Sequence, residues 1–190
     1  MNKFHHYKFR NLAATATLAA ALLASAGTQA ASFNIDVSGA QSINLQGEAG
    51  NTVWLVDIGA NALLSSLDWT LQLSAFAPSS LGDMQVSFGS SSGLDAITLS
   101  PALGDKSSGK GSYAGALDMS PYGIAAGADG LLRIEFSEAY KDAADGVAEG
   151  QWLGGSLGLG VTAAVPEPAN AALAALGLGL LFAWRRLRAR

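Results

Sequence analysis

Short segments of alternating apolar and polar residues fill the stretch from residue 31 to residue 164, and this alternation is the strongest constraint on the fold. In Leu67–Phe76, for example, leucine or tryptophan occupies every second position from Leu67 to Leu73, with polar residues between them. A period of two is typical of a β-strand with one buried face. The stretch contains no long amphipathic helical pattern. The sequence therefore predicts an all-β domain.

Similar segments recur along this stretch, separated by turns rich in glycine and proline. They predict further strands around Phe33–Val37, Thr52–Ile58, Met84–Phe88, Ala96–Leu99, Tyr113–Met119, Leu131–Phe136 and Gly155–Thr162. Of these, Thr52–Ile58 is β-branched and apolar and is expected to be a buried strand. The polar, glycine-rich stretch Gly104–Ser112 predicts a surface loop, and Ser137–Gly150 predicts an acidic connection with at most one helical turn. About eight to ten short strands of this kind predict an antiparallel β-sandwich that is jelly-roll-like.

The N-terminal segment differs from this body. A basic start is followed by an uninterrupted run of small and apolar residues over Leu12–Ala26 and then by Thr28-Gln29-Ala30, which has the small-x-small form of a cleavage site. This arrangement is typical of a secretory signal peptide, here cleaved between Ala30 and Ala31. An uncleaved helical anchor is the alternative, but the apolar run is short and rich in alanine for a permanent span.

The C-terminal segment has three parts in a fixed order. Val165–Ala169 (VPEPA) contains two prolines, which keep the chain extended and out of the preceding sheet. Ala169–Trp184 carries no charge, and as a helix it would span roughly 24 Å, enough for a membrane that thins slightly. The chain then ends in a basic stop formed by Arg185, Arg186, Arg188 and Arg190. The positive-inside rule places this stop in the cytoplasm and the body outside.

This tail resembles the PEP-CTERM sorting signal of Gram-negative bacteria, which is a Pro-Glu-Pro box followed by a transmembrane helix and an arginine-rich end. The resemblance implies recognition by an exosortase, a membrane cysteine transpeptidase-like enzyme, and cleavage near the box. It also implies transient residence in the inner membrane and delivery to the cell surface or an exopolysaccharide matrix. The recognition residues would be Val165, Pro166, Glu167, Pro168 and Ala169. A plain C-terminal membrane anchor is the alternative.

The chain is therefore expected to have three parts: a signal peptide over residues 1–30, a β-sandwich over 31–164, and a sorting and anchor segment over 165–190 with a transmembrane helix at about 169–184. The body is also loosely similar to the jelly-roll P domains of proprotein convertases, through LLRIEF at 131–136, the acidic connection after it and WLGGSL at 152–157. No site residue is transferred from that likeness.

Composition excludes several classes of function for the body. The chain contains no cysteine, and its two histidines, His5 and His6, lie in the leader. The body therefore has no thiol nucleophile, no Ser-His-Asp triad and no histidine or cysteine ligand for zinc. It carries four basic and fourteen acidic residues, a net charge of −10. Such a domain repels nucleic acid, so no nucleic-acid partner is expected.

Carboxylates offer two further alternatives. Four of them crowd the acidic connection and are weak calcium candidates: Glu138, Asp142, Asp145 and Glu149. The stretch does not match an EF-hand loop, so solvated loop charge is the simpler interpretation. Carboxylates are abundant in the body, and the sequence does not single out a catalytic pair among them. The candidates for glycoside hydrolysis are Asp57, Asp68, Glu135 and Asp142. The tryptophans Trp54, Trp69 and Trp152 are expected in the core, although an exposed pair would form a sugar platform.

Together these patterns predict a non-catalytic surface or matrix protein without a required cofactor. Its expected partners are signal peptidase and the general secretion machinery, an exosortase, the inner membrane and exopolysaccharide. The alternatives are a carbohydrate- or calcium-binding module and, less favoured, a carboxylate-based hydrolase.

Overall fold

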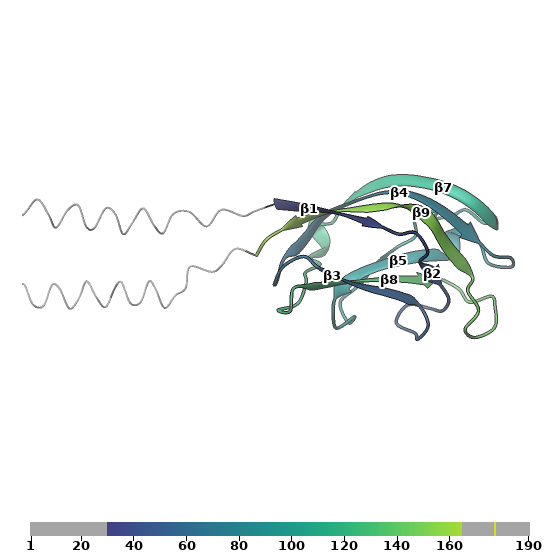
Figure 1. The fold of residues 1–190 in the computed structure, drawn as a ribbon, viewed down its shortest axis with the longest axis horizontal. Coiled ribbons are helices and arrows are strands. Elements are labelled where there is room, and N and C mark those ends of the chain that lie inside the picture. The colour runs from purple at the N-terminus through teal and green to yellow at the C-terminus, as the bar shows by residue number, and fades with distance from the viewer. Residues whose placement is uncertain (1–29, 165–176, 178–190) are drawn as a thin grey trace, which may run out of the picture. The chain divides into compact units, whose positions relative to one another are not determined.

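A computed structural model describes residues 30–164 and residue 177 of the chain, and residues 30–164 form two antiparallel β-sheets (Figure 1). The five-stranded sheet has the order β1-β9-β4-β7, with the short β2 added on β9. Its strands are β1 (Ala30–Asp36), β2 (Gln41–Ser42), β4 (Leu63–Ala75), β7 (Gly109–Asp118) and β9 (Gly150–Thr162). The two longest strands, β4 and β9, therefore lie side by side at its centre.

The four-stranded sheet has the order β3-β8-β5-β6 and lies against the first. Its strands are β3 (Thr52–Asp57), β5 (Met84–Ser90), β6 (Ile97–Leu99) and β8 (Leu131–Glu138), and two 3₁₀ turns, η1 (Leu81–Asp83) and η2 (Ser120–Tyr122), lie in connections. Every strand pair in both sheets is antiparallel. The predicted all-β sandwich is confirmed.

Strand limits differ from the predicted ones where the ladder continues beyond the side-chain pattern. β7 begins at Gly109, inside the stretch expected to be a loop, because Ala75 at the end of β4 still pairs with it. β9 begins at Gly150 and includes Trp152, which pairs with Leu73. Residues 139–149 form turns and bends without a helical turn. Backbone pairing with a long neighbour thus extends glycine-rich segments that have no apolar alternation of their own.

Apart from Gly177, which has helical geometry, the helices expected at the two ends fall outside the described residues. Within the part of the chain that the structure describes, we find no helix with the length and apolar character that a membrane span needs.

The inner faces of the two sheets form one apolar core. The predicted inward residues of β5 and β8 are buried there: Met84, Val86, Phe88, Leu132, Ile134 and Phe136. Phe136 makes edge-on contacts with two indoles, Trp54 of β3 and Trp152 of β9, each at a ring-centroid distance of 4.8 Å. Trp152 belongs to the other sheet, so this aromatic trio joins the two layers.

Gly155 in β9 allows the two central strands to approach. Its φ is +103°, and a Cβ built there would lie 2.0 Å from the carbonyl oxygen of Thr70 in β4. The residue follows a register shift in which Leu153 has no partner, between the pairs Gln72–Gly154 and Leu73–Trp152. Only glycine has both the backbone freedom and the space that this position requires.

We expect Gly155→Ala to lower the free energy of unfolding by at least about 2 kcal/mol, because a β-carbon would push β4 and β9 apart. Gly39→Ala is the matched control, since Gly39 also has a positive φ, of +85°, but a β-carbon added there would have no other atom within 4 Å. That change should cost about 1 kcal/mol. Urea unfolding followed by tryptophan fluorescence gives both values, and equal losses would contradict the argument.

Candidate functional site

The residues assigned to sorting lie beyond the described domain. Val165–Ala169 and the arginine stop at 185–190 are outside the described residues. The point at which the domain ends is described: β9 ends at Thr162, and Ala163 and Ala164 follow it and are exposed. The expected recognition box therefore begins within a few residues of the last paired strand residue.

The expected leader cleavage site coincides with the start of β1. Ala30 and Ala31 are the first two residues of that strand, and both are exposed. Ala30 pairs with Thr162, and Ala31 pairs with Val161, across an antiparallel ladder. The first and last strand residues of the domain thus lie side by side at one end of the five-stranded sheet (Figure 1).

The four weak calcium candidates occupy different environments. Glu138 and Glu149 are buried, with 1% of each residue exposed, whereas Asp142 and Asp145 are exposed. Glu149 accepts hydrogen bonds from the backbone N–H groups of Asp142 and Ala143, each at 2.9 Å. Across residues 30–164, no three acidic or histidine side chains are arranged to hold a metal ion. Glu149 instead organises the backbone of the loop.

Glu138 is a buried carboxyl group at the end of the inner row of β8. The hydroxyl of Ser42 donates a hydrogen bond to it, and the hydroxyl of Ser79 lies 3.5 Å from its other oxygen. Burial raises the pKa of Glu138 to about 8; the Ser42 hydrogen bond opposes this rise, and the negative charges of Glu149 and Asp83 add to it. The carboxyl group is therefore protonated at neutral pH.

The position of Glu138 has a signal in the sequence. It continues the alternation of Leu132, Ile134 and Phe136, so a period of two places it inside. The sequence pattern predicted that this strand ends at Phe136 and placed Glu138 in the acidic connection. In the structure β8 continues to Glu138, so the prediction that Glu138 belongs to the connection was wrong.

Glu135 faces outward from the four-stranded sheet, as the alternation predicts, yet it is completely buried. The loop formed by residues 43–51 covers it: the Gly47 N–H and the Asn51 side-chain amide donate to the same carboxylate oxygen at 2.8 and 2.9 Å. Arg133 forms an ion pair with the other oxygen. Burial alone would raise the pKa of Glu135, but these hydrogen bonds and the guanidinium charge outweigh it and lower that pKa.

The remaining hydrolase candidates are not brought together with Glu135. Asp57 ends β3 and accepts a hydrogen bond from the Gly59 N–H at 3.0 Å, Asp68 lies on the outer face of β4, and Asp142 lies in the connection after β8. A glycosidase needs two carboxyl groups flanking one bond. These four belong to four different elements, and Glu135 is closed off from solvent.

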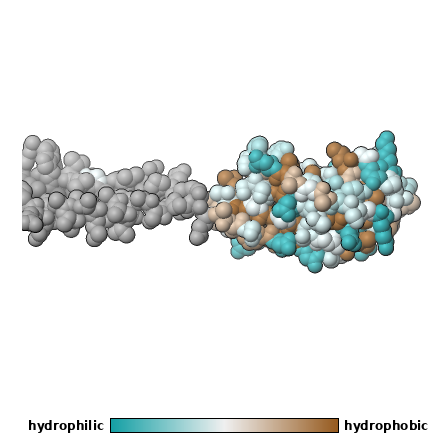
Figure 2. Space-filling model, turned by 90° about the horizontal axis from the view of Figure 1, so that it is seen from above, coloured by the Kyte–Doolittle hydropathy of each residue, from teal (hydrophilic) through white to brown (hydrophobic). Residues whose placement is uncertain are grey.

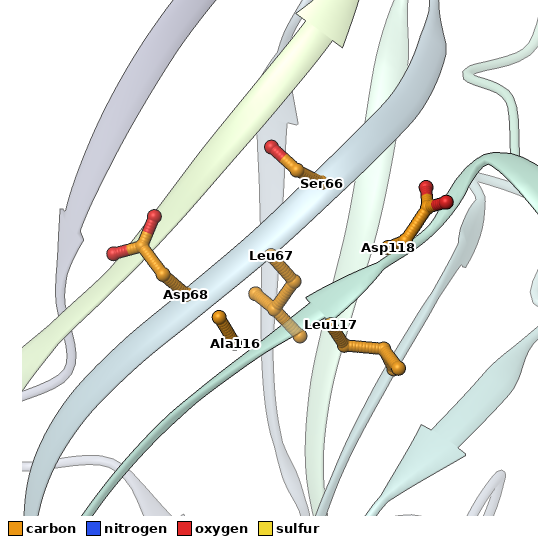
Figure 3. Close-up of a pocket in the computed structure, with 6 residues that line it drawn as sticks. All are labelled: Ser66, Leu67, Asp68, Ala116, Leu117 and Asp118. Carbon is orange, nitrogen blue, oxygen red and sulfur yellow. The ribbon is translucent and has the colours of Figure 1, made fainter.

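A shallow pocket of about 450 Å³ lies over β4 and β7 on the five-stranded sheet (Figure 3). Its lining residues are Ser66, Leu67, Asp68, Ala116, Leu117 and Asp118. Ser66 pairs with Asp118 and Asp68 pairs with Ala116, so the two carboxylates are diagonal neighbours. In Figure 3 their carboxyl groups point away from each other. The pocket offers hydroxyl and carboxylate oxygens to a small polar ligand rather than a facing acid–base pair.

The three tryptophans of the body do not form an exposed platform. Trp152 is fully buried, and Trp54 and Trp69 are half-buried and pack against the core. The indole of Trp69 lies over Gly115 of β7, where an added β-carbon would be 2.4 Å from the ring. The expectation that these tryptophans belong to the core is confirmed for Trp152, whereas Trp54 and Trp69 pack against the core from partly exposed positions.

Exposed apolar side chains are scattered over the domain. The most exposed are Leu94 and Leu103, at 92% and 86%, and both lie in connections. Figure 2 shows hydrophobic and hydrophilic residues interspersed on the visible face. Scattered apolar residues of this kind are usual on a soluble surface and do not by themselves mark an interface.

Comparisons with known proteins do not assign the chain to a family. No protein-family model matches it, and no curated protein matches it. A serine protease of Aeromonas sobria is similar over 70% of this chain and 27% of its own, with 13% identity and a TM-score of 0.41. Dimeric latent PorU of Porphyromonas gingivalis is similar over 71% and 13%, with 12% identity and a TM-score of 0.35.

A structure of infectious bursal disease virus, Gx strain, is similar over 70% of this chain and 32% of its own, with 16% identity and a TM-score of 0.34. The chain thus spans about a third or less of each of these structures. At these TM-scores the likenesses bring neither an activity nor a ligand to this chain.

The raised pKa of Glu138 makes stability depend on pH. Between its ordinary value of 4.5 and about 8, the folded protein keeps the proton while the unfolded chain loses it. Stability should therefore fall as the pH rises through this range, by up to about 1.4 kcal/mol per pH unit, and this contribution should become constant above the folded pKa. We expect Glu138→Gln, which resembles the protonated acid, to remove this fall in urea unfolding measured between these pH values.

Asp142→Asn is the matched control, since it removes an exposed carboxylate from the connection that follows β8. It should keep the wild-type slope. A wild-type protein that becomes more stable across this range, or a Glu138→Gln variant with an unchanged slope, would show that Glu138 is ionised in the folded state.

Proposed function

We propose that this chain is an exported cell-surface or exopolysaccharide-matrix protein, sorted by an exosortase through its C-terminal segment, with a structural or adhesive domain that is not catalytic. The observation that carries the proposal is the order of parts in Val165–Arg190: a Pro-Glu-Pro box, an uncharged run and an arginine end. A leader of secretory type at the opposite end supports it.

The mechanism is one of delivery. The leader takes the chain through the general secretion machinery, and signal peptidase releases it at Ala30–Ala31. The tail then holds the domain at the outer face of the inner membrane, with the arginines inside. The exosortase recognises Pro166-Glu167-Pro168 and cleaves near it, and the domain passes to the surface. A spacer of three residues, Ala163–Val165, separates β9 from the box, which supports cleavage immediately beside the folded domain.

We also propose that the sandwich is of the jelly-roll type. Leaving out the short β2, its strands alternate between the sheets in the pattern of that fold: the first, eighth, third and sixth in one sheet, and the second, seventh, fourth and fifth in the other. This architecture suits a surface module because it is held by its core without disulfides, and the chain contains no cysteine.

A non-catalytic role is supported by the chemistry that the body holds. Its sequence has neither cysteine nor histidine, Glu138 is protonated at neutral pH, and Glu135 is neutralised by Arg133 beneath a loop. The exposed carboxylates of Asp57, Asp68 and Asp142 lie on separate elements.

Replacing Pro166, Glu167 and Pro168 together by alanine should leave the C-terminal segment on the protein and keep it in the membrane fraction. The wild-type protein should lose that segment and reach the surface or matrix fraction, because only the intact box is recognised. Fractionation with intact-mass measurement reads both outcomes, in the wild type and in a strain lacking the exosortase.

Ala163→Ser and Ala164→Ser together form the control, since these two exposed residues precede the box and should leave processing unchanged. If wild-type protein keeps its whole tail and remains in the inner membrane, the segment is a plain anchor and the sorting proposal fails.

The pocket over β4 and β7 favours a carbohydrate-binding module as a second candidate. Ser66, Asp68 and Asp118 offer oxygens that can accept hydrogen bonds from sugar hydroxyls. Asp68→Asn should weaken retention on the native exopolysaccharide at least about tenfold, whereas Asp142→Asn on the far connection should not. Repeating the pull-down with millimolar calcium and with chelator tests the calcium alternative. Unchanged retention in Asp68→Asn would exclude this pocket.

A further inference from the structure

β7 is a long edge strand of the five-stranded sheet, and its outer side is free. All ten of its residues pair with β4 without a register shift. No other strand pairs with it, and none of the additional backbone hydrogen bonds of the described residues involves Gly109–Asp118. In Figure 1, β7 lies at the margin of its sheet, beyond β4. A regular edge of this length presents a row of unpaired N–H and C=O groups to another strand.

The edge lacks several features that usually protect such strands. β7 contains no proline and no bulge, and no charged residue points inward from it. Its inner row consists of Gly111, Tyr113, Gly115 and Leu117. The free edges of β1, β3 and β6 have seven, six and three residues, so β7 is the longest edge strand among the described residues.

Two opposite charges lie near the two ends of the outer row of β7. Lys110 and Asp118 are exposed, and only small residues stand between them on that face, namely Ser112, Ala114 and Ala116. Neither charge has an ion-pair partner within residues 30–164. Asp118 accepts a hydrogen bond from the Ser120 N–H at 3.0 Å.

This arrangement is self-complementary. When a second β7 lies antiparallel to the first, centred on Ala114, Lys110 of each copy stands opposite Asp118 of the other. Opposite charges directly across an antiparallel pair stabilise it. On the inner face the same register sets Tyr113 opposite Gly115 and Leu117 opposite Gly111, so each bulky residue of β7 stands opposite a glycine of the other strand. A parallel pair in register would instead set each charge opposite its own kind.

We propose that two copies of this chain associate through their β7 edges, antiparallel and centred on Ala114, so that their five-stranded sheets form one continuous sheet. The interface is isologous, as a closed twofold dimer requires. The net charge of −10 on each domain opposes association, so the dimer is expected at physiological ionic strength, where charges more than about 8 Å apart are screened. The proposal stands independently of how the chain is sorted.

Cysteine cross-linking tests the register directly, because the chain has no cysteine of its own. Full-length Ala114→Cys, purified in detergent, should form a disulfide-linked dimer, since the two Ala114 residues face each other across the axis. Thr70→Cys is the matched control: Thr70 pairs with Ala114 on the same outer face, but one strand further from the edge. Its two copies would be roughly 14 Å apart, at about 4.8 Å per strand, which is beyond disulfide reach.

Charge exchange tests the complementarity. Lys110→Asp should weaken dimerisation about tenfold in sedimentation of the full-length protein, because two acidic pairs replace two opposite-charge pairs. Asp118→Lys should weaken it similarly, and the double exchange should restore it. Restoration cannot come from a general effect on folding, since each single change is at an exposed position.

Three outcomes would overturn the proposal. One is a wild-type protein that stays monomeric at about 100 μM in physiological salt, roughly 0.15 M. Another is a dimer in which Ala114→Cys cross-links no faster than Thr70→Cys, which would assign the contact to a different edge or register. The third is a double exchange that dimerises no better than the single variants.

Discussion

The contact of Phe136 with Trp54 and Trp152 joins the two sheets, and the rest of the domain depends on it. Trp152 brings β9 against β8 from the opposite layer. β9 in turn pairs with β1, β2 and β4, so the strand that carries this indole is also the one with the most partners in the five-stranded sheet. Because β9 is the last strand in the described domain, the sandwich closes only after nearly all of the body is available for pairing, which is the pattern of a fold rich in non-local contacts.

Polar groups gather where this apolar core ends. Glu138 follows Phe136 on the inner face, and it remains there by keeping its proton and accepting a bond from Ser42. On the opposite face of the same strand, Glu135 is also buried, but it keeps its negative charge and forms an ion pair with Arg133. Two glutamates three positions apart thus have pKa values shifted in opposite directions. Their environments, and not their residue type, decide which one carries charge.

Period-two alternation was enough to predict the sandwich and the inward residues of β5 and β8, because the pattern marks the side chains that the core buries. The expectation that Thr52–Ile58 is a buried strand was wrong in part, since β3 leaves Val53 and Leu55 exposed on its outer face. The alternation failed where backbone pairing alone decides, as at Gly109–Ser112, which joins β7 only because β4 is long. It also failed to show that Glu135 would be covered, since the 43–51 loop reaches it from far along the chain. The sorting residues were proposed from their order in the sequence, and that inference does not require knowledge of the fold. The unpaired edge of β7 follows from the order of strands in the sheet, so it could not be predicted from the sequence pattern.

The ladder between Ala30 and Thr162 has a mechanical consequence. A domain attached through the end of β9 and pulled at its far end carries the load along the strand direction. With the leader removed before Ala31, as proposed, six paired positions with β1 (Ala31–Asp36) and twelve with β4 then bear the force together in shear. A hairpin pulled apart at its open end would instead release its pairs one at a time. The rate at which the domain unfolds governs how fast an applied force detaches β9. The attachment point that we propose would therefore coincide with the most extensively paired strand, which is where a module exposed to drag would best be held.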